Sequence, residues 1–141
     1  MEPFNVLEGL SFDYEGDSIV AYIPLNEQEF RLAIVGSREY EDLYKVDDLI
    51  ERLPGRVVVI SGGARGVDSR AVEAAKRLGK PWQEWTPQYD VYGRHRAPLK
   101  RNEQIARLCH AMIAFHDGES RGTLHAVRCA QELRKPVAIV R

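Results

Sequence analysis

The stretch of sequence that decides the fold is Val57-Val58-Val59-Ile60-Ser61-Gly62-Gly63-Ala64-Arg65-Gly66-Val67-Asp68. It opens with β-branched residues, a run that is typical of a strand buried on both faces of a sheet. Three glycines then lead into an alanine-rich segment that predicts a helix over 67–79, with Asp68 or Ser69 as its cap and Gly79 as its end. The stretch therefore predicts one strand–turn–helix unit of a parallel α/β sheet.

The same unit recurs on both sides of this stretch. Leu32-Ala33-Ile34-Val35 leads into Gly36, and Met112-Ile113-Ala114-Phe115 leads into the loop Asp117–Thr123. Because parallel crossovers are right-handed, we expect an α/β fold, a three-layer Rossmann-like sandwich with a mainly parallel five-stranded sheet. The expected strands lie near 31–36, 56–61, 81–86, 110–116 and 136–141, and the expected helices near 41–53, 67–79, 97–108 and 121–134.

The expected strand order, 3-2-1-4-5, decides where a ligand would bind. In an open α/β sheet, ligands lie beyond the carboxyl ends of the strands, at the point where the strand order reverses. Here that point falls between the first and fourth strands, where the loop at Gly36 would meet the loop Gly118–Thr123. The glycine-rich loop 62–66 would flank it.

Two segments differ from this strand–helix alternation. Residues 1–30 carry alternating apolar residues on either side of a turn at Glu15–Ser18, which predicts an N-terminal β-hairpin extension to a main domain over 31–141. Residues 87–97 predict the one long irregular loop of the chain. Loops of that length in compact domains are usually functional.

The bulk composition narrows the class of protein. A length of 141 residues favours one domain, and the formal net charge of -1 argues against a dedicated nucleic-acid binder. Two cysteines without metal-ligand spacing indicate a reducing, cytoplasmic setting. The sequence contains no apolar run near the ~20 residues that a membrane span needs. Its start, Met1–Phe4, has no signal-peptide pattern, so we expect neither export nor membrane insertion.

The first two glycine loops suit a phosphate or a ribose. Glycine lets backbone amides approach a ligand closely, and an arginine beside it can pair with phosphate bidentately. For the loop at Gly36, the alternative is a tight turn in which Arg38 is solvated. The run Ser61–Asp68 matches neither a Walker A motif nor Gly-x-Gly-x-x-Gly, so ATP hydrolysis and NAD binding lose their main support. The candidate ligand-binding residues of these loops are Gly36, Ser37, Arg38, Gly62, Gly63, Ala64, Arg65 and Asp68.

Asp68 has two competing interpretations. It can cap the helix that begins beside it, or it can contact a ribose hydroxyl of a ligand.

The third loop leads from the fourth strand into a helix. Its hydroxyls and amides can form an anion nest, and the helix dipole adds to their attraction. Asp117 and Glu119 are candidate ribose acceptors or catalytic acids, and the alternative is that both are solvated loop carboxylates. The candidate ligand-binding residues here are Asp117, Gly118, Ser120, Arg121, Gly122 and Thr123.

One stretch of the chain is strongly basic. It comprises Arg94, His95, Arg96, Lys100 and Arg101, followed by Asn102. Tyr89 and Tyr92 interleave with it and could stack on a base, whereas the alternative is an exposed loop running into a basic helical turn. Arg101 and Asn102 complete the candidate ligand-binding set. The histidines show no shared metal spacing, so no metal site is predicted.

Together these motifs resemble the SLOG superfamily, and most closely its YspA-type branch, over roughly residues 31–141. The resemblance implies a Rossmann-like fold that binds nucleotides or nucleotide-derived ligands at its glycine loops. Relatives include the DNA-processing protein DprA and the LOG phosphoribohydrolases, and they often form dimers or larger oligomers. The motifs that carry it are Val-Gly-Ser-Arg (35–38), Ser-Gly-Gly-Ala-Arg-Gly-Val-Asp (61–68), Tyr92-Gly93, Arg101-Asn102, Ala114–Gly118 and Ser120–Thr123.

The chain also departs from its relatives. LOG enzymes carry a catalytic glutamate after their Gly-Thr pair, and the matching position here is Ala126. The segment Arg96–Asn102 is one residue longer than the corresponding segment of the branch. Whether the protein is an enzyme therefore stays open.

Three functions follow from this resemblance and these departures. The first is a binding or sensing domain for a nucleotide or an ADP-ribose-like ligand, without a further cofactor and as a homo-oligomer. The second is an enzyme of the N-glycosidic, phosphoribohydrolase type, in which Asp117, Glu119 or Asp68 is the acid or base and Arg38 and Arg121 hold the phosphate. The third is DprA-like binding of single-stranded DNA, which the near-neutral charge disfavours.

Overall fold

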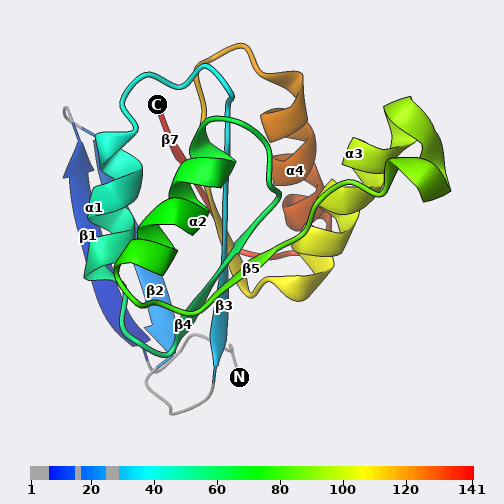
Figure 1. The fold of residues 1–141 in the computed structure, drawn as a ribbon. Coiled ribbons are helices and arrows are strands. Elements are labelled where there is room, and N and C mark those ends of the chain that lie inside the picture. Colours follow the sequence, from blue (N-terminus) through cyan, green and yellow to red (C-terminus); the bar gives the residue numbers. More distant parts are fainter. Residues whose placement is uncertain (1–6, 15–16, 25–28) are drawn as a thin grey trace.

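Seven strands and four helices follow one another in the computed structural model, which describes residues 7–14, 17–24 and 29–141 (Figure 1). The strands are β1 Leu7–Tyr14, β2 Asp17–Pro24, β3 Phe30–Gly36, β4 Val57–Ser61, β5 Trp82–Glu84, β6 Ala111–Phe115 and β7 Val137–Val140. The helices are α1 Tyr44–Arg52, α2 Val67–Arg77, α3 Tyr89–Leu108 and α4 Arg121–Glu132.

The five strands β3 to β7 form one parallel sheet in the order β5-β4-β3-β6-β7. Numbered within this sheet, the order is 3-2-1-4-5, so the sequence prediction is confirmed. The order reverses between β3 and β6, where Gly36 pairs in register with Phe115. The carboxyl ends of the strands lie together at the upper edge of the sheet in Figure 1.

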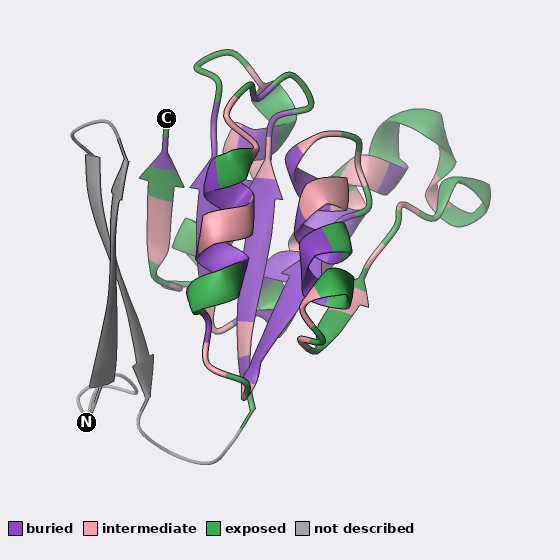
Figure 2. Cartoon of the chain, turned by 60° about the vertical axis from the view of Figure 1, so that its left-hand side comes forward, coloured by how far each residue is buried: buried purple, intermediate pink, exposed green. Residues whose placement is uncertain are grey.

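Helices cover the sheet on both faces, which confirms the three-layer sandwich. Alternate residues of a strand point to opposite faces, so Leu32 and Ile34 pack with α1 and α2, whereas Ala33 and Val35 pack with α3 and α4. Figure 2 shows the central strands as almost continuously buried. Two apolar layers therefore hold the strands rigidly and fix where their carboxyl ends lie.

The start of α2 differs from the sequence prediction. The expected cap at Asp68 or Ser69 is wrong, because α2 begins after Gly66 without a side-chain cap. Gly66 has a φ of +86°, and a Cβ there would lie 2.6 Å from the carbonyl oxygen of Arg38. The backbone supplies the missing bonds instead: the Ser69 amide donates to the Ala64 carbonyl at 3.0 Å.

The expected irregular loop over 87–97 is also wrong for most of its length. Helix α3 begins at Tyr89 and is interrupted at Gly93, whose φ and ψ are 84° and 173°. Gly93 and Pro98 both break helices, which is why the sequence pattern indicates a loop. The structure confines the break to Gly93, so the first turn of α3 projects away from the sandwich (Figure 1).

The N-terminal segment contains the expected pair of antiparallel strands. β1 and β2 form a two-stranded sheet of their own, with Leu7 opposite Pro24 and Tyr14 opposite Asp17. The centre of the expected turn, residues 15–16, lies outside the described residues. The division into an extension over 1–30 and a domain over 31–141 stays a prediction.

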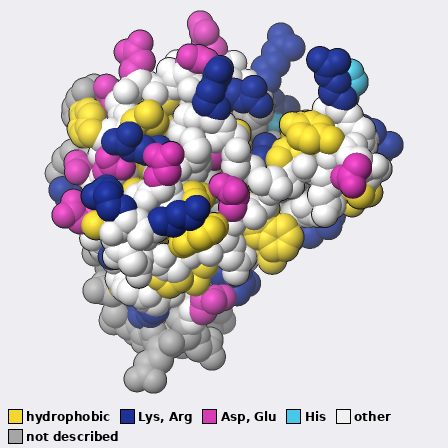
Figure 3. Space-filling model, viewed as in Figure 1, with side chains coloured by type: hydrophobic (Ala, Val, Ile, Leu, Met, Phe, Trp, Pro, Cys, Tyr) yellow, Lys and Arg dark blue, Asp and Glu magenta, His cyan; other side chains and the backbone are white. Residues whose placement is uncertain are grey.

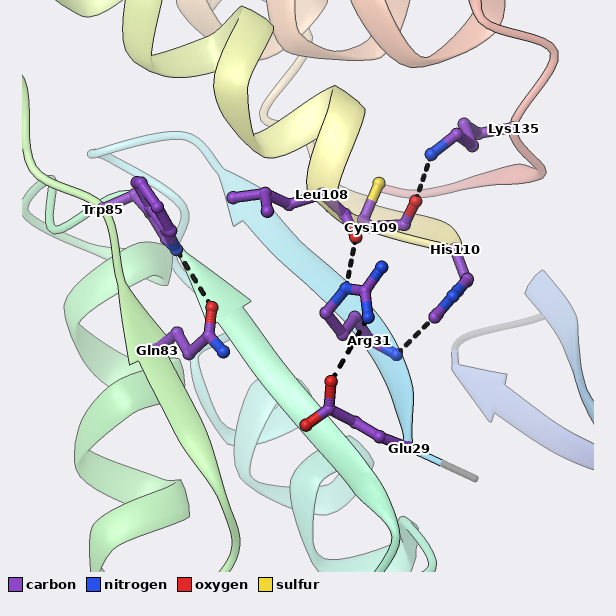
Figure 4. Close-up of polar contacts among 8 residues, drawn as sticks. All are labelled: Glu29, Arg31, Gln83, Trp85, Leu108, Cys109, His110 and Lys135. Atoms are coloured by element: carbon purple, nitrogen blue, oxygen red, sulfur yellow. Dashed lines mark hydrogen bonds and ion pairs between the residues drawn. The ribbon is translucent and has the colours of Figure 1, made fainter. Parts of the chain in front are cut away.

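Polar contacts at the amino edge of the sheet hold the end of α3 against β3 (Figure 4). The Arg31 Nε donates to the Leu108 carbonyl at 2.5 Å, and the Arg31 amide donates to Nδ1 of His110 at 2.9 Å. Lys135 donates to the carbonyls of Arg107 and Cys109. These cations donate hydrogen bonds to the last carbonyl groups of α3, at the negative end of the helix dipole. This arrangement stabilises the end of the helix.

No helix within the described residues is long and apolar enough to cross a membrane.

Candidate functional site

A hollow with a volume of about 140 Å³ lies at the carboxyl edge of the sheet, where the strand order reverses. Its walls come from the end of β3, from the loop after β4, from the middle of α3 and from the starts of α2 and α4. The lining residues that the sequence predicted as ligand-binding are Gly36, Arg38, Ala64, Asp68, Arg101, Asn102, Ser120, Gly122 and Thr123. The structure therefore brings residues from all three loops and from the basic stretch to one place.

A second hollow, of about 470 Å³, adjoins the first. The two share Arg38, Ala64, Pro98 and Arg101 as lining residues, so together they form one groove. The second hollow extends along the start of α3 to Tyr89, whose ring is half exposed. Gly63 and Arg65, also predicted as ligand-binding, line this part of the groove.

Ser37 joins the loops that follow β3 and β6, and it lines neither hollow. Its side chain is fully buried, and its hydroxyl accepts a hydrogen bond from the Asp117 amide at 3.1 Å. The same hydroxyl lies 3.5 Å from that of Thr123. Ser37 thus holds the two loops together.

Asp117 organises its own loop. Its carboxylate accepts hydrogen bonds from the amides of Glu119 at 2.8 Å and Ser120 at 2.9 Å, and these bonds lower the pKa of Asp117. Asp117 lines a separate hollow with Glu39 and His116, and Glu119 is exposed on the surface. The two carboxylates predicted as candidate acids therefore lie outside the lining of the groove.

The N-terminus of α4 presents unpaired backbone donors to the groove. The Ser120 hydroxyl caps the helix by accepting from the Thr123 amide at 3.3 Å. Within the described part of the chain, the amides of Arg121 and Gly122 have no acceptor, as expected for the first turn of a helix. A Cβ at Gly122 would meet nothing within 4 Å, so a ligand can approach these amides closely.

At two of the glycines predicted to bind a ligand, the fold itself leaves no room for a side chain. A Cβ at Gly36 would lie 2.6 Å from the Phe115 carbonyl oxygen and from the Val67 side chain. A Cβ at Gly62 would lie 2.7 Å from Arg101 and 2.8 Å from Asp68. These glycines allow the loops and α2 to pack closely, whereas the open space beside Gly122 faces the groove.

Arg101 links the loop after β4 to the groove. It is largely buried, it donates to the Gly62 carbonyl, and its Nε donates to Oδ1 of Asn102 at 2.9 Å. The Asn102 amide nitrogen in turn donates to the Gly122 carbonyl at 3.3 Å and lies 3.1 Å from Nδ1 of His125. Burial lowers the pKa of Arg101, and Asp68 opposes this effect, so the guanidinium stays charged at neutral pH.

His125 and Cys129 form a contact that the sequence reasoning missed. Cys129 Sγ lies 3.6 Å from Nε2 of His125, and Asn102 lies on the other side of the ring. Asn102 is oriented by its bonds to Arg101 and Gly122, so its NH₂ group donates to Nδ1 of His125. The neutral imidazole then carries its proton on Nε2 and cannot accept the thiol proton. Burial also raises the pKa of the Cys129 thiol, so this thiol is not activated as a nucleophile.

Asp68 lies at the base of the groove, on the first turn of α2. One of its oxygens, Oδ2, accepts from the Ala64 amide at 3.3 Å, so the residue braces its own glycine loop. Burial raises the pKa of Asp68 to about 6, although the charge of Arg101 and the nearby amides of Ala64, Gly36 and Gly62 lower it. Asp68 and Arg101 are far apart in the sequence, and the tertiary structure brings them together at this hollow.

The exposed arginines at this edge differ in their partners. Arg65 pairs with Glu39 at 2.9 Å, whereas Arg38, which lines both hollows, has no acidic partner among the residues that the structure describes. Arg121 is exposed and lies beside the groove rather than in its lining. Basic side chains also gather over the projecting turns of α3, at the upper right of Figure 3.

The groove also has walls that the sequence analysis did not predict as ligand-binding. Pro98, Leu99, Ile105 and Ala126 line the first hollow. The spacing of Arg101 and Ile105 on one face of α3 is the signal that could have found Ile105. Ala126, which the sequence analysis placed at the LOG glutamate position, presents only a methyl group to the hollow.

Proteins similar to this chain include one sequence relative and two solved structures. The Gene 61 protein of Mycobacterium phage D29 is 32% identical over 116 residues, which is 76% of this chain and 93% of that protein. The DNA processing protein A (DprA) of Streptococcus pneumoniae superposes with a TM-score of 0.71 at 23% identity, over 80% of this chain and 50% of that one. Helicobacter pylori DprA gives a TM-score of 0.58 at 20% identity, over 79% of this chain and 65% of that one.

These likenesses carry different weights. The two DprA proteins share the Rossmann-like fold of this chain, and this chain spans about half to two thirds of their length. The Helicobacter pylori structure describes a single-stranded DNA binding mode of that protein. No protein-family model matches the chain.

Proposed function

We propose that this chain, which belongs to the same family as the Gene 61 protein of Mycobacterium phage D29, binds a nucleotide or nucleotide-derived ligand at the carboxyl edge of its sheet. We propose further that it is a binding or sensing domain. Its groove lies at the reversal of strand order, the usual ligand position in an open α/β sheet.

The observation that carries this proposal is a set of donors at one end of the groove that have no acceptor or acidic partner, or are still charged, among the described residues. The amides of Arg121 and Gly122 begin α4, and the guanidinium groups of Arg38 and Arg101 line the same hollow. A helix N-terminus together with two arginines is a favourable site for a phosphate group. Among the described residues, Asp68 has the only carboxylate that lines this hollow, so positive charge is in excess.

The shape of the groove favours a whole nucleotide over an isolated phosphate ion. The second hollow lies beyond the phosphate end and has a volume of about 470 Å³. Tyr89 is one of its lining residues. An aromatic ring offers a surface on which a base can stack. A mononucleotide or an ADP-ribose-like molecule would span both hollows.

The contacts at this edge favour binding over cleavage of the ligand. Ala126 has no group that can take part in proton transfer, and Asp117, whose Oδ1 accepts from two amides of its own loop, does not line the groove. A lowered pKa also makes Asp117 a poor general acid. These features support the sensing reading over a phosphoribohydrolase.

The test is a thermal-shift titration of three proteins, the wild type and the variants Gly122→Glu and Gly55→Glu. Each is titrated with AMP, ADP-ribose and inorganic phosphate. Both glycines have open space at Cβ, and Gly55 lies in the turn between α1 and β4, at the opposite edge of the sheet. A glutamate on the first turn of α4 favours the helix and repels phosphate. We expect the wild type and Gly55→Glu to be stabilised by AMP, and Gly122→Glu to fold but to lose the shift. If no ligand shifts the wild type at millimolar concentration, the proposal is wrong.

A second candidate function is the binding of single-stranded DNA. It is favoured by the projecting turns of α3, where Tyr89 in the groove is followed by exposed Arg94 and Arg96. Stacking rings next to cations are typical of single-strand binders. The similarity of the fold to that of DprA is a further argument for this function.

Fluorescence anisotropy with a labelled oligothymidylate tests the second function. Binding that weakens steeply with salt, and weakens further in Arg94→Glu/Arg96→Glu, would support it. An oligonucleotide that binds no more tightly than free nucleotide would favour the first function. Membership of the YspA-type branch, which rests on the motifs at 35–38 and 61–68, is part of the proposal. Self-association and a cytoplasmic location stay predictions.

A further inference from the structure

Asp68 and Arg101 place opposite charges side by side in the small hollow. Asp68 is 4% exposed and Arg101 9%, and both line the hollow. A Cβ at Gly62 would lie 2.7 Å from Nη1 of Arg101 and 2.8 Å from Oδ2 of Asp68, so the two groups lie close together beside this glycine. Their hydrogen bonds go elsewhere, since Oδ2 accepts from the Ala64 amide and Arg101 donates to Asn102 and to the Gly62 carbonyl. The two charges therefore act on each other through space.

The charge of Asp68 changes within the physiological pH range. Burial raises the pKa of Asp68 to about 6, and within the described residues Arg101 has the one charged side chain that opposes this rise. The other charged or titratable groups on the surrounding elements are Arg38 after β3, in the same hollow; Arg70 of α2, paired with Asp47 of α1; exposed Glu84 of β5; His116 of the loop after β6, against the Ser120 carbonyl; and His125 of α4, in a separate hollow. Arg101 therefore responds most directly to the ionisation of Asp68.

The proposed phosphate site uses the same guanidinium group. Nε of Arg101 bonds to Asn102 and Nη1 to the Gly62 carbonyl, which leaves Nη2 without an acceptor among the described residues. A phosphate held by Nη2 and by the first amides of α4 would bring a second negative charge into the hollow that Asp68 lines. Two like charges in a partly buried site repel each other more strongly than they do in water.

We propose that Asp68 couples anion binding in this hollow to the uptake of a proton, so that a phosphate-bearing ligand binds more tightly once the Asp68 carboxylate has taken a proton from the solvent. This inference rests on the proposed nucleotide-binding function and adds a regulation of the same site by pH. It requires no contact between the ligand and Asp68, because the charge of Asp68 acts through space.

The direction of the effect follows from reciprocal coupling between the proton and the ligand. If a neutral Asp68 strengthens anion binding, a bound anion must raise the pKa of Asp68 to the same extent. The affinity is therefore highest below pH 6 and falls as the pH rises and Asp68 ionises. For charges about 7 Å apart in a partly screened site, we expect the affinity to fall about tenfold between about pH 5 and pH 8.

The first experiment measures the affinities of ADP-ribose and sulfate by calorimetry between about pH 5 and pH 8. Both ligands keep a constant charge in this range, whereas the phosphate of AMP titrates near about pH 6. The wild type should lose about tenfold in affinity as the pH rises. In Asp68→Asn, which keeps the shape of the side chain, the profile should be flatter, and only the contribution of the histidines should remain. Asp48→Asn, on α1, is the matched control and should keep the wild-type profile.

The second experiment follows Asp68 itself in the wild type. The NMR signal of its carboxyl carbon is titrated with pH in the absence of ligand and at saturating ADP-ribose or sulfate. We expect the midpoint to rise by about one pH unit in the bound protein, which matches a tenfold change in affinity. This comparison needs no variant, so it decides the matter even if Asp68→Asn does not fold.

The outcomes separate this inference from the proposed function. If the ligands bind but the midpoint of Asp68 stays the same, the inference is wrong and the binding site stands. An equally steep loss of affinity in folded Asp68→Asn would assign the pH dependence to the histidines and overturn the inference. If neither ADP-ribose nor sulfate binds at any pH, the proposed function fails and this inference fails with it.

Discussion

The two edges of the sheet use arginine in opposite ways. At the amino edge, Arg31 bonds to the Leu108 carbonyl, to the ring of His110 and to Glu29 (Figure 4). At the carboxyl edge, Arg101 of α3 bonds to the Gly62 carbonyl in the loop after β4, whereas Arg38 beside it has no acidic partner among the described residues. The amino edge is closed by its own contacts, whereas the carboxyl edge leaves the first amides of α4 without an acceptor among the described residues.

The difference teaches how to separate structural polar groups from ligand-binding ones. Lys135 and Arg31 satisfy the last carbonyls of α3, and this arrangement stabilises the fold without exposing a site. Among the described residues, the first amides of α4 have no acceptor, and Gly122 lines the hollow. A protein keeps such costly groups together where a ligand satisfies them.

The largest expected effect is on the pH dependence of stability in Asp68→Asn. Burial raises the pKa of Asp68 from 3.8 to about 6, so its contribution to stability is present below pH 3.8 and is lost as the pH rises through 6. The wild type should therefore lose about 3 kcal/mol relative to the variant across this range. Urea unfolding of both proteins at several pH values measures the difference.

A control separates this effect from the general loss of a negative charge. Asp90→Asn removes an exposed carboxylate from the first turn of α3 and should follow the wild-type profile. If Asp68→Asn also follows the wild-type profile, the buried Asp68 carboxylate does not cost stability at neutral pH. The carboxyl edge then does not differ from the amino edge in this respect.

The next largest effect compares one arginine from each edge. Arg101→Met should destabilise the protein by about 2 kcal/mol, because the Gly62 carbonyl loses its donor and Asp68 loses the nearby charge. Arg31→Met should cost about 1 kcal/mol through the lost bond to Leu108. Only Arg101→Met should also abolish the thermal shift with AMP. Loss of AMP binding in Arg31→Met would remove the functional distinction between the edges.

The smallest expected effect is at His110, and it has the opposite sign to that at Asp68. Nδ1 of His110 accepts from the Arg31 amide, and burial and the charges of Arg31 and Lys135 lower the pKa of the ring. Its contribution is therefore present above pH 6.5 and is lost as the pH falls. His110→Asn keeps an acceptor that does not titrate, so acid should destabilise the wild type more than the variant. Equal acid sensitivity in urea unfolding would contradict this.

Much of the fold follows from local sequence patterns. The run Val57–Ile60 and its counterparts at 32–35 and 112–115 predict buried parallel strands, and the glycines after them mark one edge of a sheet. The first turn of α3 was missed because Gly93 and Pro98 are helix breakers wherever they stand. Their effect depends on the residues that pack around them, which a local pattern does not contain.

The candidate site was less predictable than the fold. Ser37 and Asp117 have the right chemistry for a ligand, yet both bond to the loops that pack against them. Gly36 needs its missing side chain because Val67 lies there. These partners come from distant segments and depend on the tertiary structure, whereas the open position of Gly122 follows from its place on the first turn of α4.

The most direct test of the account is an NMR titration of the ¹⁵N-labelled protein with AMP. The account predicts that the backbone amides of Arg121 and Gly122 shift most and that the amide of His110, at the amino edge, stays unchanged. It is contradicted if AMP leaves the α4 amides unmoved, or if the largest shifts occur at the amino edge.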